Sequence, residues 1–364
     1  MANADLTRLR LFHQGIVGPA HAGPGEVVRR LGALQAQDYR QSLWAIGLRT
    51  RRSTVTDIER AIAAGQILRT WPMRGTLHFV PPEDARWMLR LSAARVIARD
   101  RRRLEQLELD AAIMERCKEL FYDALHGGRR LPRSRMMQVL EGAGISTAQQ
   151  RGYHVLWHTA QTGLICIGPL QDNEQTFVLL DEWAPKPREL SREEALAELA
   201  GRYFAGHGPA TVRDFAWWSG LTVTDARAGL EAAKPGLIAA MLDGKECWMA
   251  DDALDQTAYE GSSVCLLPGF DEYLLGYKDR SAVLAPEHAP RIVPGNNGVF
   301  LPTIVVDGQV VGTWQRRRNK NAVEIFLSPF APLGASAERV IEAASRYSAF
   351  LGLPLSAIAI EASN

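Results

Sequence analysis

Two glutamines separated by one residue are the side chains whose spacing most clearly suggests chemistry. Gln35 and Gln37 follow a predicted amphipathic helix at residues 25–34. Residues two apart in an extended stretch project to the same side, so the two carboxamides would face one point. Each carboxamide carries hydrogen-bond donors and an acceptor. The alternative is that both glutamines cap backbone groups at the end of the helix.

Other catalytic templates are absent or incomplete in the sequence. There is no Walker A loop, no glycine-rich dinucleotide fingerprint and no His-Glu-x-x-His motif. His154 and His158 stand four residues apart on one helix face, but no third ligand has a suitable spacing, so we favour packing or phosphate contact. We therefore expect no metal and no cofactor. Four cysteines far apart in apolar surroundings predict buried free thiols: Cys117, Cys166, Cys247 and Cys265.

Charge is divided unevenly along the 364 residues, although the formal net charge is only +1. Residues 1–160 hold 25 Lys+Arg against 15 Asp+Glu, whereas residues 161–364 hold 17 against 26. Of the 42 cations 36 are Arg, whose planar fork suits bidentate phosphate contacts. The near-neutral net charge by itself argues against a nucleic-acid partner. The uneven distribution, however, indicates a basic domain attached to an acidic one, and a basic domain can bind nucleic acid. No paired carboxylates stand out in the basic half as groups for acid–base hydrolysis. In the acidic half, Asp271, Glu272 and Asp279 are open to a structural interpretation.

The composition is that of a soluble globular protein. With 46% hydrophobic and 23% charged residues, it excludes wholesale disorder, collagen and coiled coil. No apolar run reaches the roughly 18 to 20 residues that span a bilayer, and Asp5 and Arg8 interrupt the region where a signal peptide would be apolar. We expect a cytoplasmic protein with no membrane partner.

A weak internal repeat organises the chain. Thr56 with Glu59, Thr147 with Gln150, and Thr222 with Asp225 have the spacing of a capping box at a helix start. Each predicted helix leads into two strands: residues 67–71 with 76–80, 164–167 with 176–180, and 237–242 with 246–250. Helices followed by a two-stranded ribbon, three times over, predict three tandem winged helices that contact DNA. The alternative is an α+β domain in which helix, glycine and strand simply recur.

Two further segments carry clustered cations. A helix beginning at Glu83-Asp84 bears Arg86, Arg90, Arg95, Arg99, Arg102 and Arg103, mostly on one broad face that is either a phosphate-tracking surface or a solvated face. The second segment lies near the C-terminus, where strands are predicted at residues 300–306, 309–315 and 322–327, with Asp307-Gly308 as a tight hairpin turn between the first two. A helix at about 336–351 and a strand at 355–360 complete the predicted elements. A dense cationic cluster follows this hairpin: Arg316, Arg317, Arg318 and Lys320. The pattern predicts either a hairpin that enters a DNA groove or an edge strand whose charges prevent aggregation.

Four separated segments resemble one bacterial family. They are Leu31-Gly-Ala-Leu-Gln-Ala-Gln-Asp38, Thr70-Trp-Pro-Met-Arg-Gly-Thr-Leu-His78, Leu267-Pro-Gly-Phe-Asp-Glu-Tyr-Leu-Leu-Gly-Tyr277, and Asn297-Gly-Val-Phe300 with Val306-Asp-Gly308 and Gly312-Thr-Trp314. Together, and in this order, they resemble the winged-helix family of AlkZ-like DNA glycosylases over essentially the whole chain.

The resemblance implies an α+β fold of three tandem winged helices that form a C-shaped channel for duplex DNA. The expected segments are residues 1–82, a winged helix with the Gln-x-Gln motif; 83–185, a helical connector and second winged helix; 186–260, a third; and 261–364, a β-rich segment with a groove-entering hairpin. The resemblance also implies a monofunctional DNA glycosylase that excises N7-alkylated purines, including interstrand crosslinks. A second branch of the family has Asp in place of the second Gln. Gln37 favours the branch associated with crosslink unhooking and antibiotic self-resistance.

The implied chemistry suits two carboxamides. Alkylation at N7 makes the purine cationic and a good leaving group, so the enzyme needs chiefly to place a water at the anomeric carbon and stabilise an oxocarbenium-like transition state. We assign Gln37 as the main water-positioning residue and Gln35 as its partner. Asp38 is a candidate electrostatic helper, unless it caps the next helix instead.

The expected partner is double-stranded DNA that carries N7-alkylpurine lesions, bound by a monomer and placing the protein at the nucleoid. Arg95 and Arg99 are expected to contact phosphates. Trp71, Arg74 and His78 on the first wing, and the hairpin of residues 307–320, are candidates for groove contacts. The alternative function is a non-catalytic winged-helix DNA-binding protein or transcriptional regulator, since winged helices occur mostly in regulators.

Overall fold

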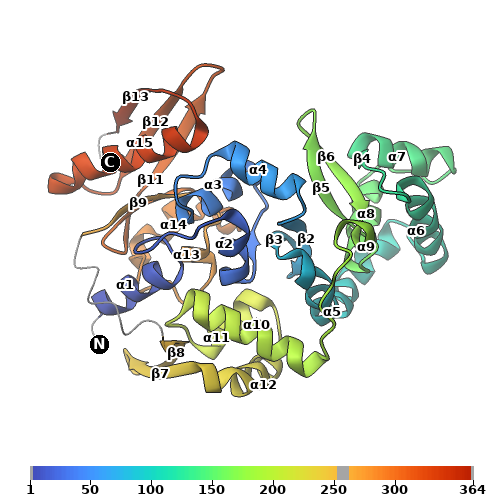
Figure 1. Ribbon diagram of the computed structural model, residues 1–364, viewed down its shortest axis with the longest axis horizontal. Helices are drawn as coiled ribbons and strands as arrows, with labels where there is room; N and C mark the ends of the chain where they lie inside the picture. The colour runs from blue at the N-terminus through green and yellow to red at the C-terminus, as the bar shows by residue number, and fades with distance from the viewer. Residues whose placement is uncertain (1–2, 252–261, 362–364) are drawn as a thin grey trace. The chain divides into compact units, whose positions relative to one another are not determined.

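The computed structural model describes residues 3–251 and 262–361, which fold into two compact units. The first unit comprises Met1–Ile58 and Leu196–Asn364, and the second comprises Glu59–Ala195. Both combine helices and strands, which confirms the α+β class (Figure 1). Charge does not follow this division: the second unit holds 20 Lys+Arg and 18 Asp+Glu, and the first holds 22 and 23. The expected basic and acidic domains are therefore wrong as descriptions of compact units.

The first unit contains most of the helices from both ends of the chain. They are α1 (Asn3–His13), α2 (Pro24–Leu31), α3 (Tyr39–Arg49), α10 (Arg192–His207), α11 (Val212–Ser219), α12 (Val223–Ala233), α13 (Glu272–Leu275), α14 (Ala289–Ile292) and α15 (Ala337–Leu351). The short strand β1 (Leu34–Gln35) separates α2 from α3, and α4 (Val55–Ala63) continues the chain into the second unit. The hairpin β7 (Leu237–Leu242) and β8 (Lys245–Ala250) pairs as predicted.

A five-stranded sheet forms the C-terminal part of the first unit. Its strands are β9 (Val264–Leu267), β10 (Thr303–Val306), β11 (Gln309–Arg318), β12 (Val323–Pro329) and β13 (Leu355–Ile360), in the order β13-β12-β11-β10-β9. Asp307 and Gly308 have φ angles of 48° and 81°, as a tight hairpin turn requires, and this confirms the predicted β10–β11 turn. Helix α15 carries Tyr347, whose ring packs edge-on to Trp314 of β11 and Trp44 of α3 at 4.9 and 5.2 Å. This aromatic cluster fixes α3 to the sheet.

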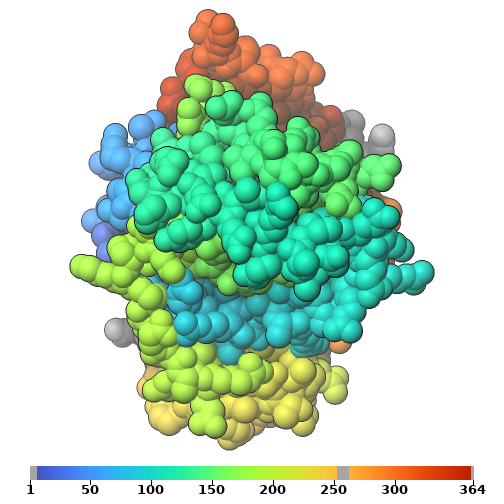
Figure 2. Space-filling view, turned by 90° about the vertical axis from the view of Figure 1, so that its right-hand side faces the viewer, coloured from blue at the N-terminus to red at the C-terminus, as the bar shows by residue number. Residues whose placement is uncertain are grey.

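The second unit is built around a mixed core of helices and strands. Its helices are α5 (Ala85–Gln106), α6 (Ala111–Leu125), α7 (Arg133–Gly142), α8 (Arg151–Gln161) and α9 (Leu180–Trp183). Its strands β2 (Leu68–Met73), β3 (Thr76–Val80), β4 (Leu131–Pro132), β5 (Ile165–Gln171) and β6 (Glu174–Leu179) lie in the order β3-β2-β5-β6-β4. The predicted pairs β2–β3 and β5–β6 are confirmed. Figure 2 draws the surface of this unit mainly in teal to green.

The predicted helix caps are partly right. Thr222 caps α12 by accepting the N–H of Asp225, as predicted. Before α4, however, the reciprocal pair is Thr54 with Asp57 rather than Thr56 with Glu59. Before α8 the prediction is also wrong, because the hydroxyl of Thr147 bonds to Glu141 and Gln150 enters the helix with a φ of 73°. Within the described ranges, no helix has both the length and the apolar character needed to cross a bilayer.

Candidate functional site

The Gln-x-Gln segment lies in a short extended stretch between two helices of the first unit. Gly32, with a φ of 77°, ends α2, and the chain then runs as β1 before α3 begins. Burial alternates along this stretch: Leu34 and Ala36 are 1% and 0% exposed, whereas Gln35 is half-buried and Gln37 is exposed. This alternation is the one that an extended chain produces on the surface of a core. It places the two glutamines on the solvent side.

Asp38 is the N-cap of α3. Its Oδ1 accepts the main-chain N–H of Gln41 at 3.1 Å, and its Oδ2 accepts the side-chain amide of the same residue at 3.0 Å. The capping alternative raised for this residue is therefore present in the structure. The role of electrostatic helper stays a prediction. The cap also fixes the direction in which α3 leaves the glutamine segment.

Gln41 ties the glutamine segment to a loop that is far away in sequence. Its Oε1 accepts the main-chain N–H of Gly269 at 2.5 Å. A Cβ atom at Gly269 would lie 2.6 Å from the carbonyl oxygen of Phe300 and 3.1 Å from Gln41 Oε1, so this close approach requires glycine. The loop of residues 268–272 is consequently held against the start of α3.

A buried ion pair closes the other end of α3. The Arg49 guanidinium donates to both carboxylate oxygens of Asp271, at 2.8 and 2.9 Å, and neither side chain is more than 2% exposed. Its other donations go to the carbonyl of Ala45 and to both the carbonyl and the side-chain oxygen of Gln14. Burial alone lowers the pKa of Arg49, but the adjacent Asp271 carboxylate outweighs it and raises that pKa above its ordinary value. Asp271 is thus structural, as the sequence allowed.

Glu272, which follows Asp271 in the chain, contacts the main chain of Gln35. Its Oε1 accepts the main-chain N–H of Gln35 at 2.9 Å, and its Oε2 accepts the indole N–H of Trp218 at 2.8 Å. The Nε2 atom of His207 is 3.3 Å from the same Oε2. Glu272 is 1% exposed. Reasoning from the sequence missed this contact, although Glu272 belongs to one of the four segments that carry the family resemblance.

The residues expected to bind DNA from the first wing are divided between surface and core. Trp71 is 5% exposed within the core of the second unit, and His78 is 0% exposed on β3. Their assignment to groove contacts is corrected, because buried side chains have no surface to offer DNA. Arg74 lies in the β2–β3 turn with a φ of 54° and is half-buried. It remains a candidate.

Helix α5 carries the predicted arginines along most of its length. Arg95 and Arg99 are both exposed. Arg86 forms an ion pair with Asp181, and Arg90 pairs with Glu189 at 2.5 Å. The predicted phosphate-tracking surface, which stays a prediction, therefore narrows to the second half of the helix, beyond these two ion pairs.

The C-terminal cationic cluster lies on a different hairpin from the one expected. Arg316, Arg317 and Arg318 end β11, and Lys320 lies in the turn that leads to β12. At the Asp307-Gly308 turn, Gly308 is buried and its carbonyl accepts from the Tyr273 hydroxyl at 2.8 Å, whereas Asp307 is exposed. The prediction of a groove contact, which stays a prediction, therefore applies to the β11–β12 hairpin rather than to the β10–β11 turn. Arg317 also approaches Glu324 at 3.6 Å and stacks over Phe326 at 5.2 Å.

The histidine pair shows no sign of a metal site. His154 Nδ1 is 2.9 Å from an oxygen of Asp100, which makes a simple pair between α8 and α5. Burial lowers the pKa of His158, the residue one turn on. In the part of the chain that the structure describes, no three His, Cys, Asp or Glu side chains gather as metal ligands. All four cysteines are buried and free, as predicted.

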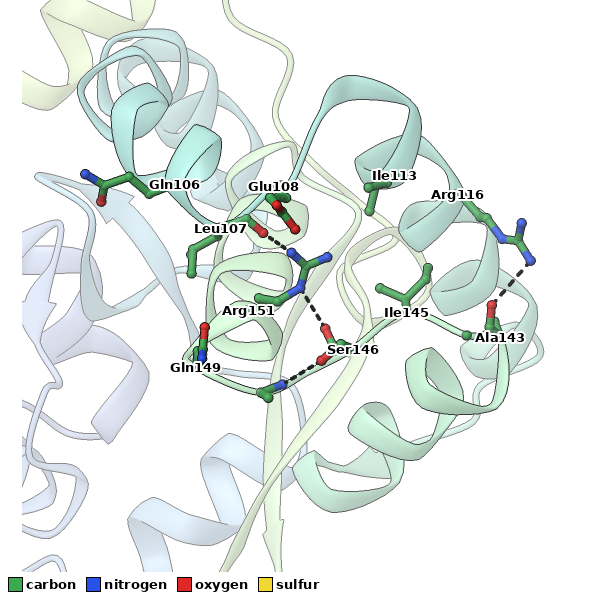
Figure 3. A pocket seen from close by; sticks show the side chains of 12 residues that line it. Gln106, Leu107, Glu108, Ile113, Arg116, Ala143, Ile145, Ser146, Gln149 and Arg151 are labelled. Atoms are coloured by element: carbon green, nitrogen blue, oxygen red, sulfur yellow. Dashed lines mark hydrogen bonds between the residues drawn. The ribbon is translucent and has the colours of Figure 1, made fainter.

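A pocket of about 660 Å³ lies in the second unit between α5, α6 and the loop before α8 (Figure 3). Its arginines already bond to main-chain carbonyls: Arg151 to Leu107 and Ser146, and Arg116 to Ala143 (Figure 3). No nucleophile with an adjacent base lines it. The pocket therefore lacks the features of a reaction site, in contrast to the anchored glutamine segment.

Comparison with known proteins gives consistent matches. A model of the family described as "DNA glycosylase AlkZ-like" matches residues 28–350. The interstrand DNA cross-link repair glycosylase of Streptomyces sahachiroi is 28% identical over 329 residues, which cover 84% of this chain and 85% of that protein. The solved structure of the Streptomyces sahachiroi DNA glycosylase AlkZ superposes with a TM-score of 0.82 at 23% identity, covering 99% of this chain and all of that one. The fold is therefore the same.

Proposed function

The chain belongs to the AlkZ-like DNA glycosylase family, and from this premise we propose that it hydrolyses the N-glycosidic bond of cationic N7-alkylated purines in duplex DNA. The substrates include bulky adducts and interstrand crosslinks, since the Streptomyces relative is named for crosslink repair. The observation that carries the proposal is the Gln35–Gln37 segment: two glutamines at accessible positions of a stretch whose backbone is held at Gln35 by the buried Glu272 and is followed by the Asp38 cap of α3.

Gln37 positions the attacking water and Gln35 assists it. A carboxamide oxygen accepts a hydrogen bond from water and turns its dipole toward the positive charge that develops at the anomeric carbon. Holding the water in place lowers the entropic part of the barrier. Gln37 takes the main role because it is the more exposed of the two, and thus the more accessible to a nucleotide.

No strong general acid is needed for this reaction. The N7-alkylated base carries a positive charge before the bond breaks and leaves as a neutral purine, so its departure requires little protonation. The absence of a nucleophile from the glutamine segment favours direct hydrolysis, which leaves an abasic site and an intact strand. The enzyme is accordingly monofunctional and requires neither metal nor cofactor.

Three winged-helix units contact the duplex. The second is supported by the order α6–β4–α7–α8–β5–β6, in which β4 pairs with β6 as the first strand of a winged helix does. The third is supported by α10–α11–α12–β7–β8, with Ala210 bridging to Trp248 in the place of that strand. The first winged helix is supported by the order α2–β1–α3–α4–β2–β3, which matches the order of elements in the second. In this order the glutamine segment begins at β1, the first strand of that winged helix.

Phosphate contacts come from Arg95 and Arg99 on α5, and groove contacts come from Arg74 and the β11–β12 hairpin. These cations supply affinity that does not depend on sequence, as lesion recognition at arbitrary sites requires. The protein acts as a monomer on DNA in the cytoplasm.

The test is a release assay on three duplexes that carry 7-methylguanine, a bulky N7-guanine adduct or an N7 interstrand crosslink. We expect free adducted base from the first two substrates and unhooked strands from the third, with abasic sites that break only on alkali treatment. If the protein binds all three duplexes but releases base from none of them, a non-catalytic DNA-binding protein is favoured instead.

A further inference from the structure

We propose that Glu272 is a positioning residue for the Gln35–Gln37 segment, an inference that rests on the proposed function. It is the buried carboxylate that accepts the main-chain N–H of Gln35, in a segment where Gln35 is half-buried and Gln37 is exposed.

Three nitrogen atoms converge on this one carboxylate. Gln35 N and Trp218 Nε1 donate to separate oxygens at 2.9 and 2.8 Å, and His207 Nε2 lies 3.3 Å from the second. A carboxylate is costly to remove from water, and its hydrogen bonds are stronger than those of a neutral acceptor. A neutral amide would satisfy these donors less well. The chemistry of the site therefore favours a charged acceptor at the amide of Gln35.

The partners of Glu272 cannot easily turn away. The ring of His207 stacks on Tyr203, with centroids 4.8 Å apart and an interplanar angle of 15°, and packs against Trp218 at 5.1 Å. Trp218 is 0% exposed. Because these rings are enclosed, the position of each Glu272 oxygen is set by them rather than by solvent.

The main chain of Glu272 is equally constrained. It is the first residue of α13, whose N-cap is the ion-paired Asp271, and its carbonyl accepts from Gln14 Nε2 at 3.3 Å. The glutamine segment is thus held at Gln35 by Glu272 and at its far end by the cap of α3 and the Arg49–Asp271 pair. Sub-ångström placement of catalytic groups depends on such support.

The test uses Glu272→Gln, Trp218→Phe and the double variant. The glutamine keeps one acceptor oxygen, so either Gln35 N–H or the indole N–H must face its NH₂ group. Removing the indole N–H by Trp218→Phe lets the remaining oxygen return to Gln35. We expect Glu272→Gln to lower the single-turnover rate of base release at least tenfold at saturating DNA. The single-turnover rate of the double variant should recover to within threefold of the rate of Trp218→Phe. This recovery is expected even though the lost indole makes the double variant less stable than Glu272→Gln.

A matched control exists in the second unit. Asp84 is 0% exposed and accepts the indole N–H of Trp87 at the same 2.8 Å, far along the chain from the glutamines. Asp84→Asn should lower the melting temperature without changing the rate of base release. A purely structural Glu272 predicts instead that activity follows melting temperature in every variant. Rescue in a less stable double variant would contradict that view, and absence of rescue would overturn the proposal.

Amide hydrogen exchange at residues 34–37 gives a second readout that does not require activity. We expect faster exchange in Glu272→Gln and restored protection in the double variant. If the variants show this exchange pattern but the wild-type protein releases no base, the positioning role stands and the proposed function is wrong. If exchange at these residues is the same in all variants, Glu272 does not hold the segment.

Discussion

Arg49 and Asp271 form a buried two-pronged ion pair between residues 222 positions apart in the chain. Arg49 ends the helix that follows the glutamine segment, and Asp271 precedes the carboxylate that supports Gln35. Each of the guanidinium's three nitrogens donates to a protein acceptor. The pair therefore joins the two sequence segments from which the candidate site is built.

Breaking this pair should strongly destabilise the protein. Arg49→Met leaves Asp271 buried without its cation, a change that typically costs about 3–5 kcal/mol in the free energy of unfolding. Urea denaturation followed by tryptophan fluorescence measures it. Glu231→Gln, which breaks the exposed pair with Lys234, should cost less than about 1 kcal/mol. Equal losses in the two variants would show that the buried pair has no special role.

The exposed arginines of α5 should govern the salt dependence of DNA binding. Replacing Arg95 and Arg99 by Ala is expected to weaken binding to any duplex and to reduce the slope of log K against log salt by about 0.9 for each phosphate that is no longer neutralised. Fluorescence anisotropy over a salt series gives the slope. Lys234→Ala, which removes a single positive charge from another helix region, should leave it unchanged. An unaltered slope in the Arg95/Arg99 variant would remove α5 from the interface.

The β11–β12 hairpin should contribute a second set of DNA contacts. Neutralising Arg317, Arg318 and Lys320 together is predicted to raise the dissociation constant for duplex DNA, with a shallower salt slope. Asn321→Ala, in the same turn, removes no charge and serves as the control. Unchanged affinity in the triple variant would favour a purely protective role for these charges.

The thiols should be inert in the native protein and set an alkaline limit to its stability. Burial raises the pKa of Cys117, Cys247 and Cys265 to about 11, so at pH 8 all three remain protonated and unreactive. Native protein should resist iodoacetamide at this pH, and unfolded protein should react. Because the folded pKa lies above the unfolded one, the associated stability is complete below about pH 8.5 and is lost toward pH 11. Urea midpoints that stay constant from pH 8 to 11 would contradict this.

Local signals in the sequence predicted local structure well. The Asp307-Gly308 turn, the Thr222 cap and the three paired hairpins each depend on residues a few positions apart, and the structure confirms them. Competing local options were harder to separate. Thr54 and Thr56 both have an acidic residue three positions on, and only the backbone geometry at the helix start decides which one caps α4.

Long-range contacts escaped prediction for a physical reason. Burial of Trp71 and His78 depends on elements that close over them from elsewhere in the chain, which a wing position alone does not reveal. Gln35 and Glu272 are 237 residues apart, so nothing in the spacing of either indicates the contact. The Gln-x-Gln segment itself was found because its two amides are adjacent, and the family resemblance supplied their chemistry.

In the proposed reaction, the carboxamides of Gln35 and Gln37 perform the water-positioning step. The most direct measurement is the single-turnover rate of 7-methylguanine release from duplex DNA by the wild-type protein and by the Gln35→Ala/Gln37→Ala variant. We predict release by the wild type and a loss of about 10²-fold or more in the variant, with DNA affinity and melting temperature unchanged. A double variant that releases the base at the wild-type rate would contradict the assignment.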